Sequence, residues 1–456
     1  MNKNKKRSTF SGKLGFVLSA AGASVGLGNI WRFPYLAAKY GGGIFLLVYI
    51  ILALTFGYTM IMAESSLGRM TRKSPVGAFE HFGKSKGFAV GGWINAIIPI
   101  LIVPYYSVIG GWVIKYLVGY IGGQSKNLAS DDYFSSFISN GLSTEICFLI
   151  FTLATLGIIY AGGRNGIERV SKFMMPILVV LSVIIAVYSV TRPGAIEGVK
   201  YFLVPNFKNF SWMTVVSAMG QMFYSLSIAM GILITFGSYM KKDTSIEKST
   251  ENVEIFDTAI AIMAGLMIIP AVFAFSGGNA ATLKSGPALM FITIPKVFAN
   301  MGLGTVIGIL FFLLVLFAAV TSSIALTESA VSTFEDELHW SRKKSTVFMG
   351  IVMLLLGTLS CLGYGPLANF KILGMQFLDF FDFITNSVMM PIAAIATCLL
   401  VSKIVGVDKI EEEITKDGQA FRRKKIFCFM IKYLCPLFAT IILISSIANA
   451  FGIITM

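Results

Sequence analysis

Several oxygen-bearing side chains of this sequence stand inside long apolar runs, where polar groups cost the most free energy. Asn29 follows a glycine-rich stretch, Asp257 stands near the start of another apolar run, and Glu64 lies deep within a third. Amide, hydroxyl and carboxylate oxygens suit small, hard cations, whereas soft metals prefer thiolates and imidazoles. The chain has only two histidines, and its five cysteines show no paired spacing. This pattern favours a site of the sodium type. Hydroxyl groups in similar positions belong to Ser225, Ser227, Thr321, Ser322 and Ser323.

The glycine-rich stretch at residues 22–28 interrupts an apolar run that otherwise has the length of a membrane-spanning helix. Each of its three glycines disfavours a helix by roughly 1 kcal/mol relative to alanine. Counting from Phe10 to Gly22 at about 1.5 Å per residue gives roughly 18 Å, which is close to the bilayer midplane. A broken helix is tolerated there only where its freed backbone groups meet an ion, a solute or water. Gly22 and Gly26 also form a GxxxG motif, so helix packing is the alternative interpretation.

The elements that must position these residues are apolar runs of helical length. The chain has 456 residues, of which 55% are hydrophobic and 13% are charged, and its mean hydropathy is +0.77. These values are typical of helical membrane proteins, and we expect an all-α integral membrane protein with eleven transmembrane helices and no soluble domain. A second interruption, at residues 225–231, lies in the sixth span. The spans are expected at about 14–38, 43–68, 89–122, 146–162, 170–190, 213–239, 255–275, 303–334, 346–364, 376–402 and 426–455.

The distribution of basic residues predicts the topology. The net charge is +14, and most Lys and Arg residues fall in alternate connections between the apolar runs. Cytoplasmic segments of membrane proteins carry this excess, so the charge is explained without a nucleic-acid partner. We therefore expect a cytoplasmic N-terminus and, after eleven spans, an extracytoplasmic C-terminus. The first apolar run is too long for a signal peptide and lacks a cleavage site. The predicted cytoplasmic segments are 3–7, 69–86, 164–172, 241–248, 342–344 and 403–425.

Short motifs along nearly the whole chain carry a family resemblance. They read SVGLGNIWRFP at 24–34, ESSLGR at 64–69, PYY at 104–106, TSSIA at 321–325 and FEDEL at 334–338. In this order they resemble the signature of the neurotransmitter:sodium symporters, and most resemble the bacterial amino-acid transporters with eleven spans, of the tyrosine-transporting type. The resemblance implies two inverted five-helix repeats, at about 11–190 and 213–402, with broken helices 1 and 6. It also implies one extra helix at about 426–455.

The resemblance implies two sodium sites at the first break. The first site would use the Ser24 carbonyl, the side chains of Asn29, Ser225 and Asp257, and the carboxylate of a bound amino acid. The second site would use carbonyls of Gly22, Val25 and Ala318 with the hydroxyls of Thr321 and Ser322.

The resemblance also implies a substrate pocket and two gates. Tyr106 and the amides of Leu27 and Gly28 would bind the substrate carboxylate at the start of a half-helix, where an anion is favoured. The outer gate would join Arg32 and Asp382, supported by Gln221. The inner gate would join Arg7 and Asp336, with Ser238 and Tyr239 beside them, and Glu64 would be a buried carboxylate. The full predicted set of substrate-binding residues is Ser24, Leu27, Gly28, Ile102, Tyr106, Tyr224, Ser225, Ser227, Met230, Ser323 and Leu326.

The resemblance implies sodium-coupled symport of an amino acid by alternating access in the bacterial cytoplasmic membrane. Met230 is long and adaptable, so we expect tyrosine or another bulky hydrophobic substrate. Animal members bind chloride where they have an Asn; Asp257 would supply that negative charge here, so we expect no chloride requirement. A proton-coupled amino-acid transporter of the same architecture, with Asp257 or Glu64 carrying the proton, is the main alternative. A channel or an enzyme fits less well, since we find no ring of like charges and no nucleophile–base pair. The sequence leaves a non-transporting sensor and the oligomeric state open.

Overall fold

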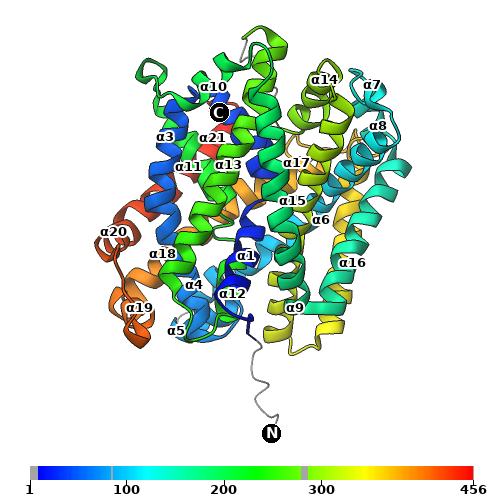
Figure 1. Ribbon diagram of the computed structural model, residues 1–456. Coiled ribbons are helices and arrows are strands. Elements are labelled where there is room, and N and C mark those ends of the chain that lie inside the picture. The colour runs from blue at the N-terminus through cyan, green and yellow to red at the C-terminus, as the bar shows by residue number, and fades with distance from the viewer. Residues whose placement is uncertain (1–8, 84–85, 279–285, 455–456) are drawn as a thin grey trace.

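A computed structural model describes residues 9–83, 86–278 and 286–454 of the chain. Long helices run roughly side by side along most of the molecule, and within the described residues β-structure is limited to isolated bridges (Figure 1). In the view of Figure 1, the lower end of the bundle holds α1 (Lys13–Ser24), α5 (Pro75–Phe82) and α19 (Val407–Ile414). The upper end holds α7 (Ser125–Leu128), α10 (Ala195–Leu203) and α14 (Ile294–Ala299). We use lower end and upper end in this sense.

The long helices match the predicted apolar runs in order. Nine described helices are long and apolar enough to cross a membrane, and a tenth span arises if the bent pair Lys13–Ser24 and Gly28–Lys39 is counted as one. The two halves of that pair meet at 55°. The nine are Gly43–Thr71, Ala89–Ile121, Gly141–Gly162, Asn165–Val190, Ile246–Ser276, Gly304–Glu337, Arg342–Leu362, Phe377–Val405 and Lys424–Ala450.

The sixth predicted span takes a different form from the others. It consists of two short helices, α11 (Trp212–Ser225) and α12 (Ile232–Ser238), neither of which reaches spanning length alone. Between them, Ser227, Ala229 and Gly231 all have positive φ angles, a conformation that interrupts any right-handed helix. Within the described chain, length and apolarity therefore support nine to ten spans, and the predicted number of eleven is not confirmed.

The break in the first span begins at Val25, which leaves the helical conformation with φ −72° and ψ 95°. The chain then resumes as a π-helical turn, Gly28–Arg32, and continues into α2 (Phe33–Lys39). Pro34 is the second residue of α2, which directly follows this π-helical turn. The break is therefore held between two well-formed half-helices, and its polar backbone lies in the buried centre of the bundle.

Two long connections between the spans contain helices of their own. The connection at 191–212 holds α10 (Ala195–Leu203), and the one at 276–300 holds α14 (Ile294–Ala299). The remaining helices are α3 (Gly43–Leu52), α4 (Tyr58–Thr71), α5 (Pro75–Phe82), α6 (Lys86–Ile121), α7 (Ser125–Leu128), α8 (Tyr133–Ser139), α9 (Gly141–Val190), α13 (Ile246–Ser276), α15 (Gly304–Glu337), α16 (Arg342–Leu362), α17 (Phe377–Asp382), α18 (Met390–Leu399), α19 (Val407–Ile414), α20 (Lys424–Phe429) and α21 (Cys435–Ala450).

Candidate functional site

A first polar cluster joins the two broken spans to α13. The Asn29 side-chain amide donates to Ser225 Oγ at 2.9 Å and to Asp257 Oδ1 at 2.8 Å. Ser225 Oγ also donates to Asp257 Oδ2 at 3.0 Å. All three side chains are buried, and the sequence predicted that they would meet. The Tyr49 hydroxyl, which the sequence analysis did not identify, donates to Ser225 Oγ at 3.1 Å and to Asp257 Oδ2 at 3.3 Å.

A second polar cluster lies on the other side of the first break, against α15. Ser322 Oγ lies 3.3 Å from the Gly22 carbonyl oxygen, 3.1 Å from that of Ala23 and 3.3 Å from that of Val25. The Thr321 hydroxyl donates back to its own helix, to the Ala318 carbonyl at 3.1 Å among others. Carbonyl and hydroxyl oxygens thus converge from α1 and α15. This donor set fits a small, hard cation, because such ions prefer oxygen ligands.

A small pocket of about 30 Å³ lies between the breaks and α6. The Leu27 amide donates to the Tyr106 hydroxyl oxygen at 3.3 Å, so backbone and side-chain donors meet at one wall. The Tyr224 ring lies against Gly28 so closely that a Cβ atom at Gly28 would stand 2.4 Å from two ring carbons. Nine of the residues predicted to bind substrate line the pocket: Ser24, Leu27, Gly28, Ile102, Tyr106, Tyr224, Ser227, Met230 and Leu326. The other lining residues are Ala23, Gly26, Asn29 and Ser322.

Two residues predicted to bind substrate lie outside this lining. Ser225 belongs to the first polar cluster, since its hydroxyl is engaged with Asp257. Ser323 faces α9, where its hydroxyl shares a hydrogen bond with Thr155 at 3.2 Å. Its helical position explains this, because Ser322 and Ser323 point about 100° apart on α15. Of the hydroxyl run on α15, Ser322 is therefore the member that faces the pocket.

A larger cavity of about 360 Å³ opens above the pocket toward the upper end. Arg32 and Asp382 both line it, but the structure records no ion pair between them. The Arg32 guanidinium carbon lies 5.4 Å from the centre of the Tyr224 ring. Asp382 instead accepts a hydrogen bond from the Tyr105 hydroxyl at 3.2 Å and one from the Asn386 amide at 2.5 Å. Gln221 donates to the Gly28 carbonyl at 3.1 Å, so it supports the break directly.

At the lower end, the predicted gate residues contact other partners. Tyr239 donates to Glu328 Oε1 at 2.8 Å, and Arg342 binds the same carboxylate. Asp336 accepts the Ser74 backbone N–H at 2.6 Å. Arg7, the predicted partner of Asp336, lies outside the described residues, so this pair stays a prediction. The sequence analysis assigned no gate role to Glu328, eight residues before Asp336, or to Arg342, six residues after it.

Glu64 binds the second break. Its Oε1 accepts the Ala229 backbone N–H at 2.8 Å, and the side chain is fully buried in α4. Ala229 has φ +58°, so its amide has left the regular helix pattern. The carboxylate therefore accepts a hydrogen bond from a buried backbone N–H that the break leaves without a helical partner. This contact explains why a carboxylate, whose burial costs free energy, stands at position 64.

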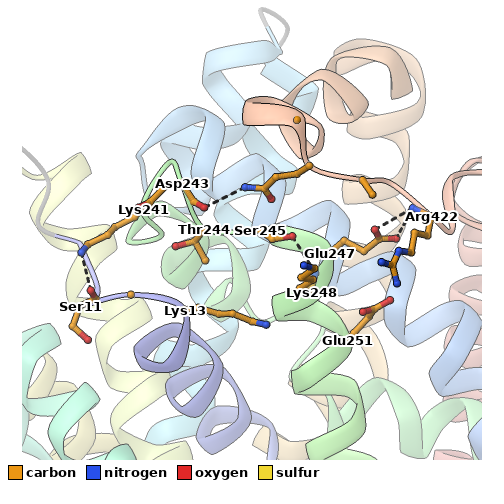
Figure 2. A pocket seen from close by; sticks show the side chains of 14 residues that line it. Ser11, Lys13, Lys241, Asp243, Thr244, Ser245, Glu247, Lys248, Glu251 and Arg422 are labelled. Atoms are coloured by element: carbon orange, nitrogen blue, oxygen red, sulfur yellow. Dashed lines mark hydrogen bonds between the residues drawn. The ribbon is translucent and has the colours of Figure 1, made fainter.

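A cavity of about 650 Å³ at the lower end contains none of the predicted sodium or substrate residues (Figure 2). It lies between the start of α1, the connection 241–245, the start of α13 and the connection 418–422. Its charges are mixed, and one of its carboxylates is already engaged: Glu247 accepts the Tyr58 hydroxyl at 2.7 Å and the Arg422 backbone N–H at 2.9 Å. This cavity has no counterpart in the predicted site.

Comparisons with known proteins identify the family and the fold. The family described as the Sodium:neurotransmitter symporter family matches residues 7–131 and 135–453. The chain is 33% identical to the uncharacterized sodium-dependent transporter YhdH of Bacillus subtilis, over 98% of both chains. It is 32% identical to an uncharacterized sodium-dependent transporter of Haemophilus influenzae, over 97% of this chain and 99% of that one. The fold is similar to a crystal structure of MhsT in complex with L-phenylalanine, with TM-score 0.86 and 35% identity, covering 96% of this chain and all of that one.

Proposed function

Because the chain belongs to the sodium:neurotransmitter symporter family and is a sodium-dependent transporter, we propose that it moves an amino acid into the cell with sodium by alternating access. The observation that carries this proposal is the placement of two polar clusters on either side of one small pocket. Both clusters use the break after α1, and one also uses the end of α11. The enzymatic alternatives are excluded by the family, whose members are transporters.

Each oxygen cluster is proposed to hold one sodium ion. Asn29, Ser225 and Asp257, with the Ser24 carbonyl, form the first site. The carbonyls of Gly22, Val25 and Ala318 with the hydroxyls of Thr321 and Ser322 form the second. The support is that these side chains meet in pairs within 2.8–3.3 Å at the centre of the bundle. Sodium would replace some of the hydrogen bonds that now join these groups. Asn29 now directs its amide nitrogen to Ser225 and Asp257, while its Oδ1 accepts the Gly26 N–H at 3.2 Å, so its oxygen would have to turn toward the ion.

The substrate is proposed to be an aromatic or bulky hydrophobic amino acid, with tyrosine first. Its carboxylate would bind the Leu27 and Gly28 amides and the Tyr106 hydroxyl, because amides at the start of a half-helix favour an anion. Its side chain would contact Ile102, Tyr224, Ser227, Met230 and Leu326. The cavity of about 30 Å³ has room for about one water molecule, so the Tyr224 ring and the flexible Met230 side chain must move aside. MhsT, which has a similar fold, was crystallised with L-phenylalanine.

Chloride is proposed to be unnecessary. The carboxylate of Asp257 lies within the first cluster and is fully buried. This carboxylate supplies a fixed negative charge next to the first sodium site, of the kind that chloride provides in animal members. A bound anion would add a second negative charge at this place, which the low-dielectric interior disfavours.

The transport cycle is proposed to alternate between the two ends of the bundle in a bacterial cytoplasmic membrane, with the lower end facing the cytoplasm. The cavity beside Arg32 and Asp382 gives the pocket a route toward the upper end. These two side chains would pair when that route closes. Release on the lower side would require the contacts around Tyr239, Glu328 and Asp336 to separate.

Uptake of radiolabelled tyrosine into proteoliposomes tests the proposal. An inward sodium gradient should drive accumulation, whereas replacement of sodium by potassium at fixed pH should abolish it, and replacement of chloride by gluconate should leave it unchanged. Unlabelled phenylalanine, leucine and glycine serve as competitors, and the aromatic amino acid should compete best. Uptake that persists in potassium and follows a pH gradient would support the proton-coupled alternative. Stronger competition by leucine than by phenylalanine would refute the aromatic preference.

A further inference from the structure

The lower end of the first half-helix is fastened to α9 by a carboxylate that the transport mechanism above does not use. Glu168 is buried, and its two carboxylate oxygens accept both the backbone N–H of Ser11, at 3.0 Å, and the Ser11 hydroxyl. Lys172, one turn further along α9, pairs with Glu168 at 2.6 Å and donates to Ser11 Oγ at 3.0 Å. Ser11 lies two residues before α1 begins at Lys13, so this carboxylate also lies near the N-terminal end of a helix, where negative charge is favoured.

The same segment is held from a second direction. The Lys241 ammonium group donates to the Ser11 carbonyl at 2.7 Å, as Figure 2 shows. The Phe10 backbone N–H donates to the Tyr239 carbonyl at 2.9 Å. The chain before α1 is therefore bound both to α9 and to the segment that follows α12. These contacts must break for the lower half of the first span to move away from α9.

Glycine allows the carboxylate to come this close. A Cβ atom on Gly15 would stand 2.5 Å from Glu168 Oε1 and 2.6 Å from its carboxyl carbon. No real Cβ atom tolerates such a distance, so any larger residue at position 15 would push the carboxylate away. The first turn of α1 is therefore shaped to receive Glu168, and Gly15 provides a second way to test the contact without removing the charge.

One face of α9 connects this contact to the second oxygen cluster. Residues 168, 171 and 175 follow the i, i+3, i+7 spacing of a single helix face. At one end of this face Glu168 contacts Ser11, and at the other end Ser171 and Met175 approach Gly22: a Cβ there would lie 3.3 Å from Ser171 Oγ and 3.4 Å from Met175 Sδ. Separation of α1 from α9 would thus open a path beside a carbonyl that we assign to the second sodium ion.

We propose that Glu168 is a positioning residue: it latches α1 to α9 in the state closed at the lower end, and its release accompanies the departure of sodium from the second site. The proposal rests on the proposed function for the identity of the ion. The latch itself rests on the Ser11, Lys172 and Gly15 contacts. A weakened latch should raise the population of the state open at the lower end, and sodium, which favours the closed state, should then be needed at higher concentration.

Cysteine labelling tests the latch directly. Ser171→Cys is the reporter, since Ser171 is buried against α1 in the closed arrangement. Cys147 and Cys428, the partly exposed native cysteines, are replaced by Ser, and the other three are buried. The purified full-length protein in nanodiscs is labelled with a maleimide in sodium and in potassium. In sodium, Glu168→Gln should label about tenfold faster than the parent, because hydrogen bonds to a charged group are the stronger ones. The matched control, Glu197→Gln, removes an exposed ion-pair carboxylate on α10 and should label like the parent.

Gly15→Ala is a second variant that weakens the contact between Glu168 and Ser11 without removing the carboxylate, so an effect shared with Glu168→Gln is not explained by misfolding of one variant. It should also accelerate labelling, although the Glu168 charge remains. In uptake assays Glu168→Gln should raise the sodium half-saturation several-fold while the maximal rate changes less than twofold. Labelling rates of Glu168→Gln and Gly15→Ala equal to those of Glu197→Gln in both salts would overturn the latch. Labelling needs no amino acid, so fast, sodium-sensitive labelling without tyrosine uptake would refute only the proposed substrate.

Discussion

Replacement of Asp257 by Asn is the sharpest test of the first sodium site, because it changes the charge with little change in size. The Asp257 carboxylate accepts hydrogen bonds from Asn29 at 2.8 Å, from Ser225 at 3.0 Å and from Tyr49 at 3.3 Å. Hydrogen bonds to a charged group contribute about 1.5–3 kcal/mol, compared with about 1 kcal/mol for neutral pairs. A sodium ion beside the carboxylate would gain a further electrostatic attraction that the amide lacks. A net loss of about 1.4–2.8 kcal/mol corresponds to roughly a 10- to 100-fold loss of sodium affinity.

The assay measures initial uptake of radiolabelled tyrosine as a function of sodium, in chloride and in gluconate. For Asp257→Asn the sodium half-saturation should rise 10- to 100-fold in gluconate, and chloride should lower it again by restoring a negative charge near the ion. The parent protein should show no such difference between the two anions. Glu254→Gln is the matched control, since it neutralises a carboxylate on the same helix that pairs with Arg423 at 3.3 Å, away from the cluster. An unchanged sodium half-saturation in Asp257→Asn, with full uptake, would refute the assignment.

Three further substitutions probe the pocket, the second sodium site and the lower end. Gly28→Ala should displace the Tyr224 ring, which would lie 2.4 Å from the new Cβ atom, and competition assays should show aromatic substrates weakened more than small ones. Ser322→Ala removes the hydroxyl that faces three carbonyls of the first break, so the sodium half-saturation should rise about tenfold while the melting temperature shifts little. Arg69→Ala removes a buried ion pair and a hydrogen bond to the Thr244 carbonyl and leaves Glu413 only its pair with Lys416, so it should destabilise the fold by about 3 kcal/mol in thermal unfolding monitored by fluorescence. An unchanged melting temperature would show that this ion pair is dispensable.

The breaks in the first and sixth spans could be predicted because backbone chemistry exposes them in the sequence. Glycines at 22, 26 and 28 weaken a helix wherever they occur, and inside an apolar run such a weakness needs a reason. The sixth span has only one glycine, Gly231, at its break, yet Ser227 and Ala229 also adopt positive φ angles. The polar residues around residues 225–231 signalled that interruption, whereas the exact backbone path could not be inferred from them.

Residues that act by long-range contact gave no comparable signal. Tyr49 lies in an apolar run where an aromatic residue is ordinary, and its role depends on two other helices that bring Ser225 and Asp257 to its hydroxyl. Glu168 lies in a basic segment whose charges were explained by topology alone. The hydroxyl run on α15 was identified, but which member faces the pocket depends on the rotation of the helix. Only packing fixes that rotation, and it selects Ser322 over Ser323.

The two oxygen clusters and the pocket share a single short backbone stretch, and this explains how ion and solute can be coupled. In residues 22–29 the carbonyls of Gly22 and Val25 lie at Ser322, the Leu27 amide points to Tyr106, and the Asn29 side chain reaches Asp257. The carbonyls of Gly22 and Val25 and the amide of Leu27 belong to neighbouring peptide groups of this stretch, so cations at the carbonyls and a carboxylate at the amide bind one short piece of backbone. Each ligand also orders a stretch that the others need ordered. Binding of any one therefore lowers the free-energy cost of binding the rest, and this coupling is reciprocal.

On this argument, stiffening the stretch with Gly26→Ala should weaken the coupling rather than a single site. Its Cβ atom would stand 2.8 Å from Ser322 Oγ and 3.1 Å from the Tyr106 hydroxyl oxygen, which belong to the second cluster and the pocket. Isothermal titration of tyrosine with and without sodium measures that coupling, and an unchanged ratio of the two affinities in Gly26→Ala would contradict the shared-backbone argument.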